Sequence, residues 1–400
     1  MALLSVGEAL GRLLSDAAPI GVEKVSIAES ADRVLAEPLK ALRTQPPFPA
    51  SAMDGYAVHA ADLSPGAKLE VIGTAPAGAA FDGSVGVRQA VRIFTGAPVP
   101  AGADTILIQE NAKRLDERTV EVLETVVAGR HIRRAGLDFA EGDTLLDRGR
   151  VLDAAGLSLA AAANHASLPV FRRPLVAIIA TGDELLPPGS KLGPGQIIAS
   201  NSYGTAAIAR AAGADIIDLG IVRDRHEEIA ARIDQALSAK ADIIVTLGGA
   251  SVGDHDLVNQ VLTAQGMTLD FWKIAMRPGK PLMFGRLGRT RIIGLPGNPV
   301  SSLVCAHLFL KPLVAKLAGR PADADIREAA LGSDMEGNDQ RQDYVRASVS
   351  PGPGGLVATP FSTQDSSMLR VLADANGLII RPPGSPAARA GTIVPVLMLR

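Results

Sequence analysis

Cysteine and aromatic residues are scarce in this chain of 400 residues, and long basic runs are absent. The single cysteine, Cys305, excludes a disulfide or a cysteine-based metal cluster within one chain, which suits a reducing, cytoplasmic location. Aromatic residues make up 3% of the sequence, and 40 Lys and Arg stand against 42 Asp and Glu. This composition disfavours a basic, stacking surface, so we expect no nucleic-acid partner.

Membrane segments are also not expected. No apolar stretch reaches the roughly 18 to 20 residues that a membrane-spanning helix needs. The first residues, MALLSVGEALGRLLSD, lack the basic start and small-residue cleavage site of a signal peptide. Ser5 and Glu8 instead match the capping box of an amphipathic helix. We therefore expect a soluble, cytoplasmic protein with no membrane partner.

Length and hydrophobic content predict two to four domains, since 47% of the residues are hydrophobic and domains have about 100 to 200 residues. Short β-like runs with Gly and Pro turns predict an inserted β-rich domain over 46–140. Strands alternate with helices over 174–320, which predicts a doubly wound parallel α/β domain. Strand-like pieces over 321–400 predict a small β barrel. Residues 1–45 and 141–173 are expected to form an N-terminal helical and linker domain, in which Asp153 caps an Ala-rich helix.

Three apolar strands of the α/β domain end in loops rich in glycine, carboxylates and hydroxyls. The loops are TGDEL (181–185), GGASVGDHD (248–256) and LPGNPVS (295–301). Buried parallel strands are continuous apolar runs, and open α/β sheets bind ligands beyond the carboxyl ends of their strands. We therefore expect the three loops to meet in one crevice that suits a phosphorylated ligand and a metal ion.

The first two loops each allow two interpretations. Asp183 and Glu184 follow a strand directly and could bind Mg²⁺; the alternative is that Thr181 and Glu184 form a helix capping box. In the second loop, three glycines in six residues allow backbone amides to approach a phosphate. Alternatively, Ser251 and Asp254 cap a helix that begins near Asp256.

The third loop indicates a phosphate site more clearly than the first two loops do. Asn298 is a preferred N-cap residue and Pro299 suits the first helical position, so the following amides are free at a helix N-terminus. Such an end attracts phosphate. The alternative is a well-capped helix without a ligand.

Further charged residues lie near these loops. Lys273, Arg277 and Lys280 in WKIAMRPGKP could form an anion site, with Arg277 as a bidentate donor, or simply a solvated loop. Asp224, after the second strand of the domain, adds a carboxylate at the same edge, although a surface position is equally consistent with the sequence.

Two candidate loops precede the α/β domain. PPFPASAMDGYAV (46–58) carries Asp54 in an irregular stretch before a strand, and FTGAPVPAGAD (94–104) carries Thr95. Irregular loops with an acidic residue are functional more often than core segments are. The H-E-x-x-H and G-x-S-x-G motifs do not occur, so covalent catalysis has no clear candidate.

Seven motifs resemble, in order, those of the molybdopterin molybdenumtransferase family, the MoeA-like proteins that include the E domain of gephyrin. They are SAMDGYAV, RIFTGAPVPAGAD, IRRAGLD, ATGDEL, GGASVGDHD, RPGKP and LPGNPVS, and the likeness covers nearly the whole chain. The resemblance implies a central domain similar to MoaB and Mog proteins. It implies insertion of molybdate into adenylylated molybdopterin, with release of AMP and dependence on Mg²⁺. It also implies a homodimer whose active cleft is shared between subunits, and a molybdopterin adenylyltransferase as supplier of the substrate.

Site residues are carried over by the same resemblance. The catalytic group is Asp54, Thr95, Glu184, Asp224 and Asp256. The substrate-binding group is Asp138, Gly248, Gly249, Ser251, Lys273, Arg277, Lys280, Pro296, Asn298, Ser301 and Ser366. The metal ligands are Asp183, Glu184 and Asp256. Asp54 is expected to reach in from the partner subunit.

The sequence departs from the family pattern at several positions. Leu137 stands where many members have Glu, Arg277 where Lys is frequent, and Ser366 lacks the glycines that often flank it. GGASVGDHD also lacks the GGTG form of related adenylyltransferases. A molybdopterin adenylyltransferase and a noncatalytic molybdopterin-binding scaffold of the same fold are the alternatives. Molybdate and tungstate are both tetrahedral dianions, and the sequence favours neither.

Overall fold

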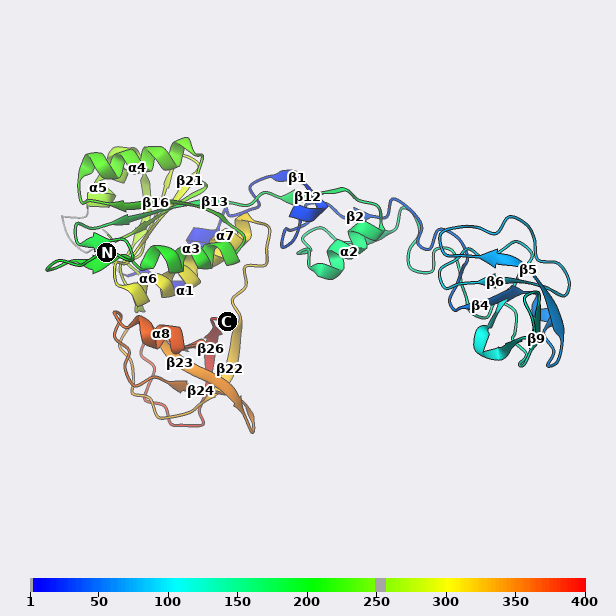
Figure 1. Cartoon of the computed structure of the whole chain (residues 1–400). Coiled ribbons are helices and arrows are strands. Elements are labelled where there is room, and N and C mark those ends of the chain that lie inside the picture. Colours follow the sequence, from blue (N-terminus) through cyan, green and yellow to red (C-terminus); the bar gives the residue numbers. More distant parts are fainter. Residues whose placement is uncertain (1–2, 249–256) are drawn as a thin grey trace. The chain divides into compact units, whose positions relative to one another are not determined.

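The computed structural model describes residues 3–248 and 257–400 (Figure 1). The chain forms two compact units. Unit 1 comprises Met1–Glu23, Asp32–Ala36 and Val170–Arg400, and unit 2 comprises Lys24–Ala31 and Glu37–Pro169. Each unit has its own hydrophobic core, and the candidate residues of the α/β domain all belong to unit 1.

A six-stranded sheet forms the centre of unit 1, in the order β16-β13-β17-β21-β20-β18. Its strands are β13 (Leu175–Thr181), β16 (Asp215–Val222), β17 (Ile243–Leu247), β18 (Thr268–Trp272), β20 (Met283–Leu287) and β21 (Thr290–Leu295). The predicted parallel pairing is confirmed for β16, β13, β17 and β21. β20 pairs antiparallel with both β18 and β21. Only Gly288 and Arg289 connect β20 to β21, and a link this short makes a hairpin.

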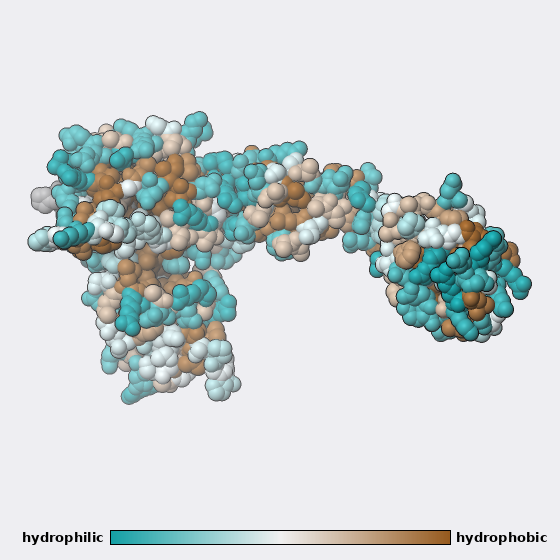
Figure 2. Space-filling model, in the orientation of Figure 1, coloured by the Kyte–Doolittle hydropathy of each residue, from teal (hydrophilic) through white to brown (hydrophobic). Residues whose placement is uncertain are grey.

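Helices cover both faces of this sheet. On one face are α1 (Val6–Leu14), α3 (Asn201–Ala211), α6 (Pro299–Cys305) and α7 (Lys311–Leu317), and on the other are α4 (His226–Ser238) and α5 (Leu257–Ala264). Alternate residues of β13 supply the two cores: Val176 and Ile178 face the first helix layer, and Ala177 and Ile179 the second. On the face shown in Figure 2, hydrophilic residues cover α4, and hydrophobic residues show beneath it where the sheet lies.

One helix is more apolar than the sequence analysis expected. Through the π-helical segment Ala306–Leu310, α6 and α7 form one continuous helix, Pro299–Leu317. Among the described residues it alone is long and apolar enough to cross a membrane, so the expectation that no such stretch exists was wrong. The helix is mostly buried against the sheet, and Val304, Phe309 and Leu313 are fully covered. It is therefore a core helix of the α/β domain.

The N-terminal helix also belongs to this core. Ser5 and Glu8 form the predicted capping box, with Glu8 N 3.2 Å from Ser5 Oγ and Ser5 N 3.0 Å from Glu8 Oε2. Ala9 and Leu13 are fully buried in the same cluster as residues of α7. Residues 1–45, which we predicted as part of one domain, are thus divided between the two units.

The last part of the chain is the predicted β barrel. Its strands are β22 (Ile326–Leu331), β23 (Gln342–Gly352), β24 (Gly355–Pro360), β25 (Gly377–Arg381) and β26 (Ile393–Met398). They pair in the order β23-β24-β22-β26-β25, and β25 returns to β23, which closes the ring. The short strand β19 (Met276–Arg277) of the α/β domain pairs with β23, and α8 (Leu369–Asp374) lies between β24 and β25 in the chain.

Unit 2 contains a second six-stranded sheet, in the order β7-β4-β6-β5-β9-β8. Its strands are β4 (Gly55–Val58), β5 (Lys68–Ala75), β6 (Gln89–Ile93), β7 (Thr105–Ile108), β8 (Ala112–Arg114) and β9 (Thr119–Val122). All neighbours are antiparallel except β5 and β6.

Shorter elements complete the chain. Three two-stranded pairs are β1 (Val22–Ser26) with β12 (Ser167–Phe171), β2 (Leu39–Lys40) with β11 (Thr144–Leu146), and β3 (Ala50–Ser51) with β10 (Ile132–Arg133). Helix α2 (Ala154–Ala162) begins after the predicted cap, because Asp153 Oδ1 accepts from Gly156 N at 2.8 Å. Single 3₁₀ turns occur at Ile27–Glu29, Ala60–Asp62 and Gln109–Asn111.

We predict that Leu13→Ala destabilises unit 1 by about 2 to 5 kcal/mol, because it opens a cavity beneath α1. The free energy of unfolding from urea titration, followed by the fluorescence of Trp272 on β18, measures the loss. Leu3→Ala, at a leucine that is 37% exposed, is the matched control and should cost less than about 0.5 kcal/mol. Equal losses for the two variants would contradict the packing of α1 into this core.

Candidate functional site

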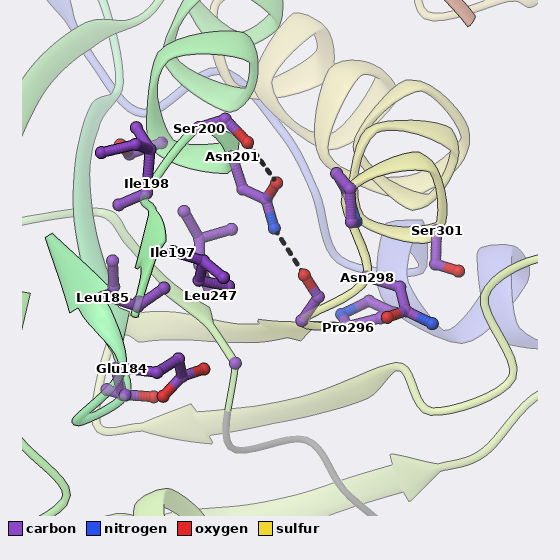
Figure 3. Close-up of a pocket in the computed structure, with 18 of the residues that line it drawn as sticks. Glu184, Leu185, Ile197, Ile198, Ser200, Asn201, Leu247, Pro296, Asn298 and Ser301 are labelled. Carbon is purple, nitrogen blue, oxygen red and sulfur yellow. Dashed lines mark hydrogen bonds between the residues drawn. The ribbon is translucent and has the colours of Figure 1, made fainter. Parts of the chain in front are cut away.

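A pocket with a volume of about 660 Å³ lies at the carboxyl ends of β13, β17 and β21. The strand ends are in register, since Ala180 pairs with Leu247 and Leu247 with Leu295. The three predicted loops therefore begin side by side. Each loop contributes to the pocket wall: Glu184 from the first, Gly248 from the second, and Pro296, Asn298 and Ser301 from the third (Figure 3).

The first loop does not lead into a helix. After Glu184 the chain forms β14 (Leu185–Leu186), which pairs with β15 (Ile197–Ile198), so the capping-box interpretation of Thr181 and Glu184 was wrong. Gly182 has φ +152°, and a Cβ atom there would lie 2.5 Å from Glu184 Oε2. Glycine at this position thus allows the Glu184 carboxylate to fold back over the strand end.

Three carboxylates lie close together at this edge. Asp224 N lies 3.4 Å from Asp183 Oδ1, and both Asp224 and Glu184 line the pocket or its rim. Desolvation raises the pKa of Asp224, and the negative charges of Asp183 and Glu184 raise it further. Such a cluster favours a hard cation such as Mg²⁺, but the described residues do not include three metal-ligating side chains already gathered around one point. Asp256, the other predicted ligand, lies outside the described residues.

The second strand end accommodates only glycine. Gly248 has φ +93°, and a Cβ atom there would lie 2.7 Å from the carbonyl oxygen of Thr181. Thr181 is buried at 4% exposure, lines the pocket, and its hydroxyl has no hydrogen-bond partner among the described residues. The predicted residues Gly249 and Ser251 lie outside the described part of the chain, as does the proposed Ser251 and Asp254 cap.

The third loop begins a helix as predicted, but its cap residue acts differently. Asn298 occupies the N-cap position and Pro299 the first turn, yet the Asn298 side chain does not cap the helix. Its Nδ2 donates instead to Ser366 Oγ at 2.9 Å, and Val300 N donates to the Ser366 carbonyl oxygen at 3.0 Å. The expected side-chain cap is therefore absent, and the prediction that the following amides are free was wrong for Val300. Ser366 joins the barrel to this loop, and its neighbour Ser367 lines the pocket.

The predicted cations are not among the residues that line the pocket. Arg277 pairs with Asp343 at the start of β23, since β19 is hydrogen-bonded to that barrel strand. The ammonium of Lys273 lies over the ring of Trp272, 5.4 Å from its centroid. Lys280 is exposed, and only its neighbour Pro281 reaches the pocket wall. Pairing of β19 with the barrel thus directs Arg277 toward a structural partner.

In unit 2 the predicted residues Asp54 and Thr95 are in contact. Asp54 Oδ1 accepts from Thr95 N at 2.7 Å and from Thr95 Oγ1 at 2.8 Å. These bonds hold the pKa of Asp54 below its usual range, and the charge of Arg92 lowers it further. Arg92 is fixed in turn, because its guanidinium lies over Tyr56 and Phe94 and donates to the Gly55 carbonyl oxygen at 3.1 Å. Asp54 is therefore a preorganised carboxylate at neutral pH.

Asp138, also in unit 2, is exposed and follows Leu137, which is 56% exposed. Its backbone N–H donates to the Gln45 carbonyl oxygen at 3.1 Å. The departure from the family pattern at Leu137 therefore places an apolar side chain on the surface.

Several pocket residues were not predicted. The polar ones include Ser200, Asn201, Ser202 and Ser367, and the apolar ones include Leu185, Ile197, Ile198 and Leu247. The segment IIASN was a detectable signal, because a short apolar run followed by Ser and Asn precedes a helix there.

The fold and the pocket define a multidomain α/β protein with a polar ligand site at its strand ends. Three family models match the chain: the MoeA N-terminal region (domain I and II) over residues 4–164, a probable molybdopterin binding domain over 177–316, and the MoeA C-terminal region (domain IV) over 328–399. Together they cover most of the sequence.

Individual relatives agree with these matches. A molybdopterin molybdenumtransferase of Haemophilus influenzae is 37% identical over 319 residues, 80% of this chain and 78% of its own. That of Bacillus subtilis is 35% identical over 406 residues, 99% of this chain and 94% of its own. A solved molybdopterin biosynthesis MoeA protein from Pyrococcus horikoshii has a TM-score of 0.85 at 29% identity, over 100% of both chains. The chain belongs to the MoeA family of molybdopterin molybdenumtransferases, enzymes of molybdenum cofactor biosynthesis, which confirms the resemblance found in the sequence.

We predict that Asp224→Asn raises the Tm at pH 7 in the absence of divalent cations. The folded state raises the pKa of Asp224, so the stability that this residue contributes is present at low pH and is lost as the pH rises through its folded pKa. The amide removes that loss, and the gain should be smaller at pH 4 than at pH 7, because protonation of the folded carboxyl group increases as the pH falls.

Asp218→Asn is the matched control for this measurement, because its carboxylate accepts from Gly220 N at 2.9 Å on the same strand. A gain for Asp224→Asn that is the same at pH 4 and pH 7 would contradict the charge cluster.

Proposed function

We propose that the protein inserts molybdate into adenylylated molybdopterin and releases AMP and the molybdenum cofactor, in the pocket at the ends of β13, β17 and β21. The supporting observation is that this pocket places carboxylates opposite hydroxyl and amide groups. Figure 3 shows Glu184 on one side and Asn298 and Ser301 on the other. One side suits a cation and the other suits phosphate and oxyanion oxygens.

The polar wall would bind the anionic parts of the substrate. Ser301 lines the pocket from the first turn of α6, and its hydroxyl would donate to the substrate there, whereas Val300 N already donates to the Ser366 carbonyl oxygen. The backbone of Gly248 and the amide of Asn298 complete this wall, beside Pro296. The opposite face carries the apolar side chains of Leu185 and Leu247, which suit a pterin ring.

Mg²⁺ is part of this proposal, and the donor chemistry fits it. Asp183 and Glu184 would hold the ion together with Asp256, and Asp224 would add negative charge next to them. A bound Mg²⁺ would neutralise phosphate charge during the reaction.

The other carried-over residues remain proposals. The segment that carries Lys273, Arg277 and Lys280 leads to Pro281, which lines the pocket. This segment would therefore approach an anionic substrate at the side of the pocket that Pro281 lines. Ser366 would act through Asn298, to which it is hydrogen-bonded. Gly249 and Ser251 would add amide and hydroxyl donors beyond Gly248.

We further propose a cytoplasmic homodimer in which Asp54 and Thr95 of one subunit complete the pocket of the other. Asp54 Oδ1 accepts from Thr95, whereas Oδ2 accepts no hydrogen bond from a described residue. A fixed carboxylate with a free oxygen is suited to act on a substrate held elsewhere. Asp138 would bind substrate from the same unit. A molybdopterin adenylyltransferase would supply the adenylylated substrate.

We predict that Glu184→Gln lowers turnover by at least about 100-fold and that Ser301→Ala lowers it by at least about 10-fold. The Tm of both variants should stay within a few degrees of wild type. AMP release from adenylylated molybdopterin with molybdate measures the reaction, and tungstate in its place measures the oxyanion preference. Glu227→Gln, on the exposed side of α4, is the control that should leave turnover unchanged. Wild-type turnover in both pocket variants would contradict the proposed location of the active site. Consumption of ATP and molybdopterin without molybdate, with formation of adenylylated molybdopterin and pyrophosphate, would instead identify an adenylyltransferase.

A second prediction concerns the shared cleft. Asp54→Ala and Glu184→Ala chains should each be inactive, yet a refolded or co-expressed mixture should recover about a quarter of wild-type activity. Half of the dimers in a statistical mixture are heterodimers, and each has one intact site of two. Size-exclusion chromatography with light scattering establishes the dimer itself. A mixture that stays inactive although heterodimers form would mean that both residues act within one chain.

A further inference from the structure

The side chain of Asn201 forms a hydrogen bond to a residue outside its own helix. Asn201 is the first residue of α3, after the N-cap position Ser200, and no side chain caps this helix. The Asn201 side chain instead reaches the turn that follows β21, where Nδ2 donates to the Gly297 carbonyl oxygen at 2.8 Å (Figure 3). The bond joins segments that are 96 residues apart in the sequence.

Packing between α3 and α6 brings Asn201 within reach of this turn. Gly204 is one turn further along α3, and a Cβ atom there would lie 2.6 Å from Leu303 Cδ2 on α6. Glycine thus allows the two helices to approach closely. Asn201, three residues earlier on the same face, is then directed at the residues that precede α6.

The orientation of the Asn201 amide is defined by its neighbours. Ser200 Oγ lies 3.4 Å from Asn201 Oδ1, and a carbonyl oxygen can accept only from the amide nitrogen. Nδ2 therefore faces Gly297. An aspartate at this position would have the same shape but would place a carboxylate oxygen against the carbonyl oxygen.

The turn that Asn201 holds is short and controls the polar wall. Only Pro296, Gly297 and Asn298 separate β21 from Pro299, and all four residues line the pocket. Gly248 N donates to the Leu295 carbonyl oxygen at 3.3 Å before the turn, and Ser366 holds Asn298 at its end. Between these two anchors, Asn201 donates to the Gly297 carbonyl oxygen.

We propose that Asn201 is a positioning residue for the molybdenumtransferase reaction. Its amide draws the Gly297 carbonyl oxygen toward α3 and so keeps that partial negative charge from turning toward the anionic substrate. It also fixes the turn that places Asn298 and Ser301 in the polar wall. The inference rests on the proposed function of this pocket as the binding site for the phosphorylated pterin.

Kinetics of Asn201 variants test this role. Asn201→Ala should raise the KM for adenylylated molybdopterin about fivefold to tenfold, with kcat changed by less than about twofold, since a single hydrogen bond is lost. Asn201→Asp, which keeps the shape but repels the carbonyl oxygen, should raise KM further than Asn201→Ala. If Asn201 acts through the start of α6, its effect and that of Ser301→Ala should not be additive in the double variant.

Matched controls separate this role from a general effect on folding. Asn111→Ala removes another asparagine side-chain bond, 2.6 Å to Glu124 in unit 2, and should leave KM unchanged. If Asn201→Ala does not fold, Asn201→Asp carries the same comparison, together with direct binding of molybdopterin. A wild-type KM in the Asn201 variants while Ser301→Ala lowers kcat/KM would overturn the positioning role alone. Wild-type kcat and KM in Ser301→Ala as well would overturn the proposed site.

Discussion

Parallel, in-register pairing of β13, β17 and β21 is the constraint on which the candidate site depends. Ala180, Leu247 and Leu295 lie across from one another, so the three loops that follow leave the sheet at the same level. Continuous apolar strands buried on both faces maintain this register, since helices of unit 1 cover each side. Carboxylates, glycine backbone and a helix start can therefore meet in one pocket although the chain separates them by more than a hundred residues.

The strand ends alone do not orient the pocket groups. Gly182 leaves room for the Glu184 carboxylate, and Gly248 avoids a clash with the Thr181 carbonyl oxygen. Two asparagines act across elements rather than within their own helices: Asn201 bonds to the turn after β21, and Asn298 bonds to Ser366 of the barrel segment. The barrel thus contributes to the organisation of the α/β pocket, in addition to its direct contribution of Ser367.

Local patterns in the sequence were sufficient for much of the fold. The capping box at Ser5 and Glu8, the Asp153 cap, the parallel strands and the closing barrel all follow from short-range periodicity and turn chemistry. The same patterns allowed a wrong interpretation of Thr181 and Glu184. A helix capping box and a loop that carries carboxylates can have the same Thr-x-x-Glu spacing, and only the chain beyond Leu185 distinguishes them. The patterns also could not show that Arg277 pairs with Asp343, since that contact depends on β19 joining a strand 66 residues away.

By itself the sequence determined the family, through seven ordered motifs, and the edge of the sheet at which the chemistry lies. It could do so because motif order and strand-end composition are properties of the linear chain. Only the tertiary structure decided which of the candidate side chains share a pocket, that Asp224 lies among like charges, and that Asn201 holds the Gly297 turn. These outcomes depend on helix packing and on the direction of single side chains. Neither is encoded in any local stretch of the sequence, because each requires two distant segments to be in contact.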